Sequence, residues 1–75
     1  MILLYKMEGC PYCKKVIDVL EKKGIEYKAL DISNPVNKDE LVRMGGKEQV
    51  PFMMDTDKKV DLYESNDIIE YLETI

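Results

Sequence analysis

The sequence predicts an α/β fold in which a four-stranded mixed sheet is flanked by three helices, in the order βαβαββα. Three observations predict it. A short apolar run is followed by an amphipathic segment and a second strand-like segment. Two further apolar runs are separated by a polar turn, and a last amphipathic segment follows them. We expect residues 1–75 to form one domain, because a chain of this length has one small core.

The first half is predicted to contain a strand, a helix and a second strand. Residues 2–6 are an apolar run suited to a strand that is buried on both faces. From Pro11 onward apolar side chains recur with helical spacing, and Gly24 is placed to end this helix. Residues 25–32 combine alternating polarity with β-branched and aromatic side chains, which indicates a strand. A right-handed crossover would place both strands in one sheet.

A short helix is predicted next. Asn37 and Glu40 have the spacing of a capping box, in which each side chain bonds to the backbone of the other residue. Such a helix would end at the glycine pair at positions 45 and 46.

A hairpin and a final helix complete the predicted fold. Residues 50–55 and 59–63 are short apolar runs joined by a polar turn, which is typical of an antiparallel hairpin. Ser65 is placed to cap the last helix. The side chains of this helix that we expect to face inward are Ile68, Ile69 and Leu72.

Composition indicates a globular protein and excludes several functional classes. Hydrophobic residues make up 45% and charged residues 35%, as in ordinary globular domains. The net charge is −4, and the eleven basic side chains are interleaved with acidic ones, so no nucleic-acid surface is expected. No histidine is present, so one chain cannot build an ordinary zinc site and no metal is expected. With no basic leader and no apolar span, we expect a cytoplasmic monomer without membrane partners.

The only two cysteines, Cys10 and Cys13, directly follow the first predicted strand. Residues i and i+3 in a first helical turn bring their sulfurs within bonding reach, and a strand, C-x-x-C and a helix in this order indicate a redox centre. A structural disulfide closing so short a loop would add little stability. Free amides at the helix start favour the thiolate of Cys10, the expected nucleophile. Cys13 lies one turn further on the apolar stripe and is the expected resolving thiol.

Side chains near the dithiol lead to two further expectations. Tyr12 lies between the cysteines, and we expect it to face outward and contact substrate, because aromatic side chains beside a nucleophile often line pockets. Lys6, Lys14 and Lys15 either lower the pKa of a nearby thiol or only solvate the surface, which is the commoner role of a lysine.

The whole chain resembles glutaredoxins. The resemblance is carried by Cys10-Pro-Tyr-Cys13 after the first strand, by Val50-Pro51 before the third, and by an acidic residue near the last helix. Glu64-Ser65, followed by Asp67-Ile-Ile-Glu-Tyr-Leu72, is similar to the N-terminal thioredoxin-like domain of glutathione transferases and of transferase-like glutaredoxins. The resemblance implies a thioredoxin-like fold and a glutathione-dependent disulfide oxidoreductase.

The same resemblance implies roles for residues far from the cysteines in sequence. Pro51 would be cis and would place the backbone of Val50 beside the dithiol, where it pairs with the cysteinyl part of glutathione. Glu64 would pair with the ammonium of the γ-glutamyl end, and the amide and hydroxyl of Ser65 would bind its carboxylate. The glycyl carboxylate would be contacted by one of two side chains, Lys38 or Gln49.

The implied reaction is the reduction of protein disulfides or glutathione mixed disulfides through the Cys10/Cys13 dithiol, with glutathione as reducing co-substrate and no bound cofactor. Its partners would be glutathione and disulfide-containing proteins. Two departures from the family are visible. Asp61-Leu-Tyr-Glu-Ser65 stands where glutaredoxins have Gly-Gly-x-x-Asp, and no helical domain follows Ile75, so transferase activity on bulky electrophiles is not expected.

Two alternatives stay open at this point. A flavoprotein resembling thioredoxin reductase would supply electrons to the same dithiol. A binding module would instead bridge an iron–sulfur cluster between two chains, using Cys10 from each chain and two free thiols. Pro11 and the nearby Cys13 argue against the cluster. Visible absorbance of protein purified without oxygen would separate the module from the enzyme.

Overall fold

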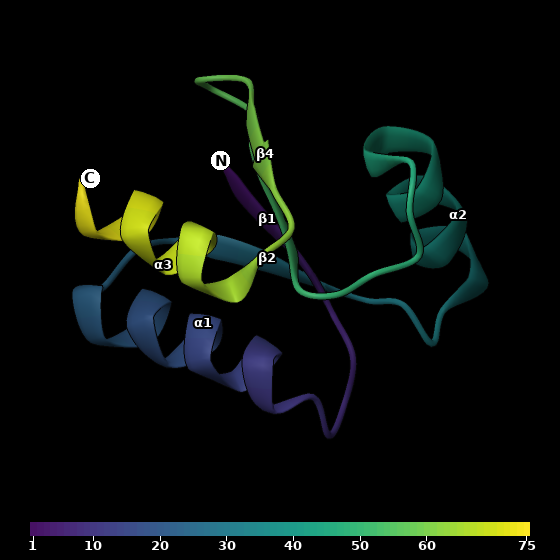
Figure 1. Ribbon diagram of the computed structural model, residues 1–75, viewed down its shortest axis with the longest axis horizontal. Helices are drawn as coiled ribbons and strands as arrows, with labels where there is room; N and C mark the ends of the chain where they lie inside the picture. Colours follow the sequence, from purple (N-terminus) through teal and green to yellow (C-terminus); the bar gives the residue numbers. More distant parts are fainter.

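A computed structural model describes residues 1–75 and shows a mixed four-stranded sheet with helices on both sides (Figure 1). The strands are β1 (Ile2–Lys6), β2 (Tyr27–Asp31), β3 (Phe52–Asp55) and β4 (Val60–Leu62). The helices are α1 (Pro11–Lys23), α2 (Pro35–Gly45) and α3 (Ser65–Glu73). This order of elements confirms the fold predicted from the sequence.

The strand order in the sheet is β2-β1-β3-β4. β1 pairs in parallel with β2, as the crossover through α1 requires, and antiparallel with β3, which forms the hairpin with β4. β2 is shorter than the predicted 25–32. The reason lies at the end of α1, where the backbone N–H of Ile25 donates to the carbonyl of Leu20 at 3.0 Å and so belongs to the helix end.

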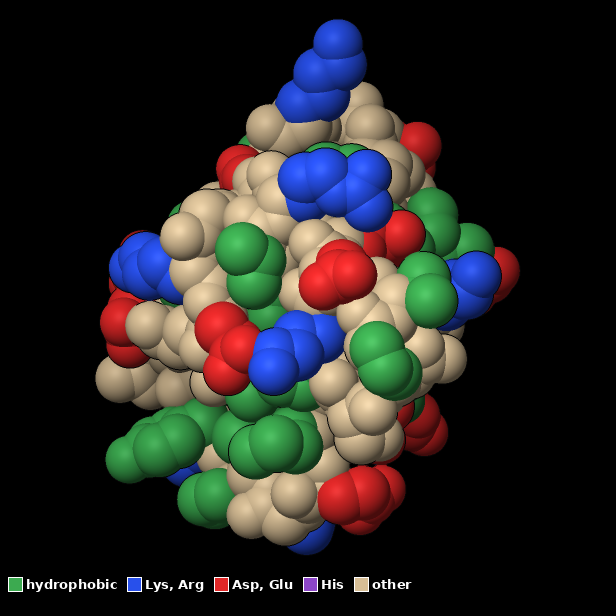
Figure 2. Space-filling view, turned by 90° about the vertical axis from the view of Figure 1, so that its right-hand side faces the viewer, with side chains coloured by type: hydrophobic (Ala, Val, Ile, Leu, Met, Phe, Trp, Pro, Cys, Tyr) green, Lys and Arg blue, Asp and Glu red, His purple; other side chains and the backbone are tan.

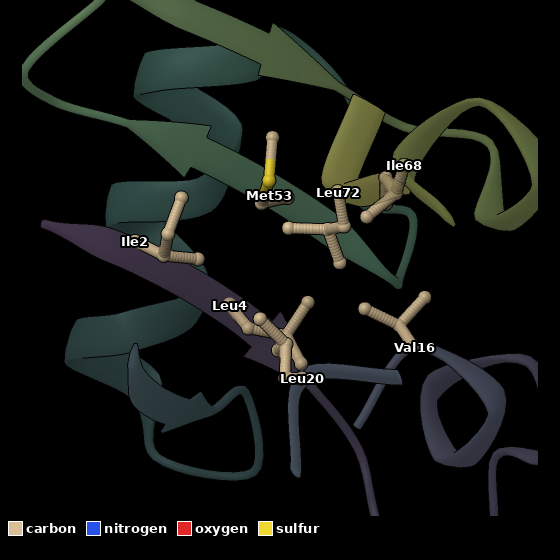
Figure 3. Close-up of a cluster of buried hydrophobic side chains, with 7 residues drawn as sticks. All are labelled: Ile2, Leu4, Val16, Leu20, Met53, Ile68 and Leu72. Carbon is tan, nitrogen blue, oxygen red and sulfur yellow. The ribbon is translucent and has the colours of Figure 1, made fainter. Parts of the chain in front are cut away.

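The sheet divides the core into two parts. The larger part lies between the sheet and the paired helices α1 and α3 (Figure 3). It consists of Ile2, Leu4, Val16, Leu20, Met53, Ile68 and Leu72. A smaller cluster of Tyr5, Leu41 and Phe52 lies on the side of α2. Leu4 and Tyr5, neighbours in β1, belong to different clusters because successive side chains of a strand point to opposite faces.

Helix α1 begins and ends where the sequence predicts. Cys10 is the N-cap, with an extended backbone, and Pro11 is the first helical residue. Gly24 ends the helix with a φ of 67°, a conformation that suits glycine, and its N–H bonds to the last turn. The buried side chains of the helix are Cys13, Val16 and Leu20.

Helix α2 begins earlier than predicted. Asn34 is its N-cap, and its side chain accepts a backbone N–H of the first turn at 2.9 Å, while Pro35 is the first helical residue. The predicted capping box of Asn37 and Glu40 is wrong because both side chains bond elsewhere. The amide of Asn37 donates to a backbone carbonyl at the end of β2, and Glu40 accepts a hydrogen bond from the Tyr5 hydroxyl.

The start of α3 also differs from the prediction. Glu64, with φ −77° and ψ 132°, is the extended residue before the helix, and Ser65 is already its first residue. The prediction that Ser65 caps the helix is therefore wrong, and the structure shows no side-chain cap at this end. Of the three side chains expected to face inward, those of Ile68 and Leu72 are buried and that of Ile69 is half-buried.

A buried carboxylate joins the hairpin to α3. Asp55 is 5% exposed and accepts a hydrogen bond from the Tyr71 hydroxyl at 2.7 Å. It also accepts the backbone N–H groups of Asp57 at 3.1 Å and Lys58 at 3.4 Å. These bonds, that of Tyr71 most strongly, lower the pKa of Asp55. The same bond raises the pKa of Tyr71 to about 12.

We predict that Asp55→Asn lowers stability at neutral pH and less so in acid. Because the folded pKa of Asp55 is lowered, its contribution is fully present above the ordinary aspartate pKa of about 3.9 and is lost as the pH falls through the folded value. A loss of about 1 kcal/mol lowers the Tm by roughly 4–8 °C in so small a domain. Thermal unfolding at neutral and acid pH measures this, with the exposed Asp61→Asn as control. An equal Tm deficit at both pH values would contradict it.

The surface over α2 carries basic and acidic side chains that are interspersed rather than gathered by sign (Figure 2). The exposed large apolar side chains of this helix are Val36, Val42 and Met44. None of the three helices combines the length and the apolar character needed to cross a membrane.

Candidate active site

Cys10 is held at the start of α1 by the turn that follows β1. Its backbone N–H donates to the carbonyl of Met7 at 3.3 Å, and its side chain is half-buried. The Sγ atom accepts the backbone N–H of Cys13 at 3.2 Å, so the sulfur takes the position that a capping oxygen takes in most helices. An N–H directed at the sulfur is a favourable partner for the thiolate form.

Cys13 differs from Cys10 in exposure and ionisation. Its side chain is 1% exposed on the inner face of α1, and both thiols are free. Burial raises the pKa of Cys13 to about 12, and the hydrogen bond with Cys10 adds to this shift. Cys13 is therefore a protonated thiol at neutral pH. One accessible thiol beside one buried thiol is the arrangement that an attacking and a resolving cysteine need.

A hollow of about 490 Å³, here called the dithiol hollow, adjoins both cysteines. Its lining residues are Lys6, Met7, Glu8, Gly9, Cys10, Pro11, Cys13, Lys14 and Ile17. The ammonium of Lys6 lies 3.4 Å from a carboxylate oxygen of Glu8 and 3.5 Å from one of Asp31. The ammonium of Lys14 lies 3.4 Å from a carboxylate oxygen of Asp18. Both lysines of the hollow thus pair with carboxylates, and the charge of Lys6 nevertheless lowers the pKa of Cys13, although burial raises it by more.

A second hollow of about 410 Å³, here called the proline groove, lies beside the first. Its lining residues are Tyr12, Gln49, Val50, Pro51, Tyr63, Glu64, Ser65 and Asn66. The bond between Val50 and Pro51 is cis, as the resemblance implies. The structure therefore brings all five predicted substrate-binding residues to one groove, whereas the two cysteines line the neighbouring hollow. The hollows adjoin at the first turn of α1, where Pro11 lines one and Tyr12 the other.

The end of the groove at α3 carries both a negatively charged carboxylate and backbone N–H groups that can donate hydrogen bonds. Glu64 is exposed, and its carboxylate has no ion-pair or hydrogen-bond partner within the chain. Directly after it, Ser65 and Asn66 begin α3, and the first amides of a helix have no partner within the helix. A free carboxylate next to free amides complements a group that carries both an ammonium and a carboxylate.

The remaining predicted contacts are divided. Tyr12 is 58% exposed and faces outward, and the ammonium of Lys15 lies 5.9 Å from the centre of its ring. Gln49 lines the proline groove. Lys38 does not line it, and its ammonium pairs with the carboxylate of Glu48 at 2.9 Å. Of the two side chains considered for the glycyl carboxylate, only Gln49 is adjacent to the groove.

Two lining residues, Tyr63 and Asn66, were not expected from the sequence. Both are neighbours of Glu64 and Ser65 in the chain, and that adjacency was the one available signal. The place of Tyr63 in the groove depends on contacts with distant residues, among them the ring of Phe52, whose centre is 4.5 Å away.

The family model described as "Glutathione S-transferase, N-terminal domain" matches residues 4–75. Glutaredoxin 1 of Rickettsia prowazekii is 34% identical to the chain over 53 residues, which are 67% of this chain and 56% of that protein. The matched part thus spans little more than half the length of this curated relative.

Two solved structures are similar along almost the whole chain. A glutathione S-transferase from the Antarctic clam Laternula elliptica has 34% identity and a TM-score of 0.81, with 97% of this chain and 34% of that chain covered. Glutaredoxin 2 from Salmonella typhimurium, in complex with glutathione, has 27% identity and a TM-score of 0.77, with 97% and 33% covered.

Proposed function

The chain belongs to the family of glutathione S-transferase N-terminal domains, and from that premise we propose that it is a glutaredoxin-type thiol-disulfide oxidoreductase with glutathione as its reducing co-substrate. The observation that carries this proposal is the pairing of a half-buried Cys10, whose sulfur accepts an N–H at the start of α1, with a buried Cys13 one turn away. The similarity to glutaredoxins supports it.

The proposed reaction is an exchange of disulfides. The thiolate of Cys10 attacks the glutathione sulfur of a mixed disulfide, a Cys10–glutathione bond forms, and the other half leaves as a thiolate that takes up a proton. A second glutathione thiolate then attacks this bond, releasing glutathione disulfide and the Cys10 thiolate. In the alternative resolution Cys13 loses its proton and its sulfur attacks that of Cys10, which releases the bound glutathione as a thiolate. Two further glutathione molecules then reduce the internal disulfide to the dithiol and leave as glutathione disulfide.

Glutathione would occupy the proline groove. The backbone of Val50 would pair with the cysteinyl part, the carboxylate of Glu64 would bind the ammonium of the γ-glutamyl end, and the first amides of α3 at Ser65 would bind its carboxylate. Tyr12 would cover the side near Cys10. The free charge of Glu64 and the free amides beside it support this orientation.

The choice of electron donor is tested with Cys13→Ser. We expect wild type to reduce a small glutathione mixed disulfide with glutathione as donor, and Cys13→Ser to retain at least about half of this turnover, because external glutathione resolves the Cys10 adduct. Coupled assays with glutathione, and in parallel with a thioredoxin reductase, measure both donors. If wild type is active only with the flavoprotein and Cys13→Ser is folded but inactive, the electron donor is that reductase and not glutathione.

We predict that Glu64→Gln raises the glutathione concentration needed for half-maximal rate by about five- to tenfold. This loss of affinity is small for the removal of a charge-assisted contact, because Glu64 is exposed and water screens its charge. Initial rates over a range of glutathione concentrations measure it. Glu70→Gln, which removes another exposed carboxylate of α3, is the matched control and should leave this value unchanged. An unaltered value in Glu64→Gln would move the γ-glutamyl site elsewhere.

A further inference from the structure

The proline groove has two walls that come from different parts of the chain. The segment between α2 and β3 supplies Val50 and Pro51, and the segment between β4 and α3 supplies Glu64 and Ser65. The two walls would bind different parts of one glutathione molecule, so their relative position decides whether both parts bind at once.

The hydroxyl of Tyr63 joins the two walls. It accepts the backbone N–H of Lys47 at 3.1 Å and donates to the backbone carbonyl of the same residue at 2.9 Å. The ammonium of Lys47 lies over the Tyr63 ring, 4.8 Å from its centre. Both backbone polar groups of Lys47, three residues before Val50, are therefore held by the residue that directly precedes Glu64.

The ring of Tyr63 packs against residues of β3 and α2. Its centre lies 4.5 Å from that of Phe52, the first residue of β3, with the two planes inclined by 36°. At the hydroxyl end of the ring lies Gly45, the last residue of α2, at which a Cβ would overlap the Tyr63 hydroxyl and lie 2.7 Å from the ring carbon Cζ. Only a residue without a side chain at position 45 leaves room for the ring in this position.

We propose that Tyr63 is a positioning residue that sets the distance between the Val50 wall and the Glu64 wall and thereby makes the enzyme selective for disulfides that contain glutathione. The inference rests on the proposed function, because it requires glutathione to use both walls. Tyr63 acts through its neighbours: two hydrogen bonds fix the segment leading to Val50, the ring packs on Phe52 after Pro51, and the chain continues directly into Glu64.

The test compares two disulfides in a background of Cys13→Ser, where only Cys10 reacts. With glutathione disulfide, the Cys10 thiolate forms a Cys10–glutathione bond and releases one glutathione thiolate. With bis(2-hydroxyethyl) disulfide it forms the corresponding adduct and releases 2-mercaptoethanol. Stopped-flow kinetics and mass spectrometry give both rate constants, and their ratio measures the preference for glutathione.

Tyr63→Phe keeps the ring but removes both hydrogen bonds. We expect the preference to fall about five- to tenfold, with the rate for bis(2-hydroxyethyl) disulfide changed less than twofold. Gly45→Ala should displace the same ring and cause a similar loss of preference. The double variant should lose no more preference than the more impaired of the two single variants, because both changes break the same contact. Tyr27→Phe is the matched control, since it removes a tyrosine hydroxyl that bonds to Glu21 at 2.8 Å on the surface.

Amide hydrogen exchange provides a readout that does not depend on activity. The N–H of Lys47 is bonded to the Tyr63 hydroxyl, so its exchange should accelerate at least about fivefold in Tyr63→Phe and stay unchanged in Tyr27→Phe.

The outcomes separate this inference from the proposed function. If Tyr63→Phe keeps the same preference for glutathione disulfide as its Cys13→Ser parent, the positioning role is overturned and the proposed function stays intact. A wild-type preference no greater than that of free cysteine would overturn both. A loss of rate with both disulfides to the same degree would also overturn the positioning role, because selectivity would be unaffected.

Discussion

Replacing Cys10 by serine should abolish turnover with either electron donor, by at least about 10³-fold, which is the order of loss when the attacking group of a covalent mechanism is removed. Cys10 is the more exposed thiol, and its sulfur is the one that accepts an N–H at the start of α1. Cys13, which is buried and protonated at neutral pH, cannot replace it as the first nucleophile.

Turnover of a glutathione mixed disulfide, coupled to oxidation of a nicotinamide cofactor, measures this loss. Mass spectrometry after exposure to glutathione disulfide should find one bound glutathione on Cys13→Ser and none on Cys10→Ser. Circular dichroism of both variants controls for folding. Activity retained in a folded Cys10→Ser would assign the attack to Cys13 and reverse the proposed roles.

Leu4→Ala should cost about 3 kcal/mol of unfolding free energy, a large part of the stability of a domain this small. Leu4 is fully buried in β1, one of the two inner strands, between Ala29 of β2 and Met53 of β3, and belongs to the cluster under α1 and α3. The cavity left by the substitution cannot close easily, because strands on both sides fix its walls. The Tm should fall by more than about 10 °C.

Urea and thermal unfolding measure this loss, and Val36→Ala is its control. Val36 is an apolar residue on α2 that is 68% exposed, so its truncation should change the unfolding free energy by less than about 0.5 kcal/mol. Equal effects of the two substitutions would contradict the division between core and surface described above.

The elements that local chemistry determines were predictable. Helix α1 was placed correctly because apolar spacing, a proline at the first position and a terminal glycine agree with one another. The starts of α2 and α3 differ from the prediction because local sequence alone does not determine which residue caps a helix. Asn37 and Glu40 bond to residues of β2 and β1, and such contacts between distant segments cannot be read from local spacing.

The candidate site shows the same limit. Cys10 and Cys13 were identified from their spacing after a strand, and the pairs at 50–51 and 64–65 from the resemblance. Their division between two adjacent hollows, and the place of Tyr63 between the groove walls, depend on side-chain packing across about 16 residues of sequence, from Lys47 to Tyr63. Sequence periodicity carries no information about such contacts.

The strand order has a consequence for encounters between copies of the chain. β2 and β4 form the two edges of the sheet, where unpaired backbone groups are templates for a strand from another molecule. β4 has only three residues, with the charged Asp61 exposed at its centre, and β2 exposes the charged Lys28. A short strand and charged side chains are the usual means by which edges resist strand addition. A sheet with such edges offers a strand from a second copy little backbone with which to pair.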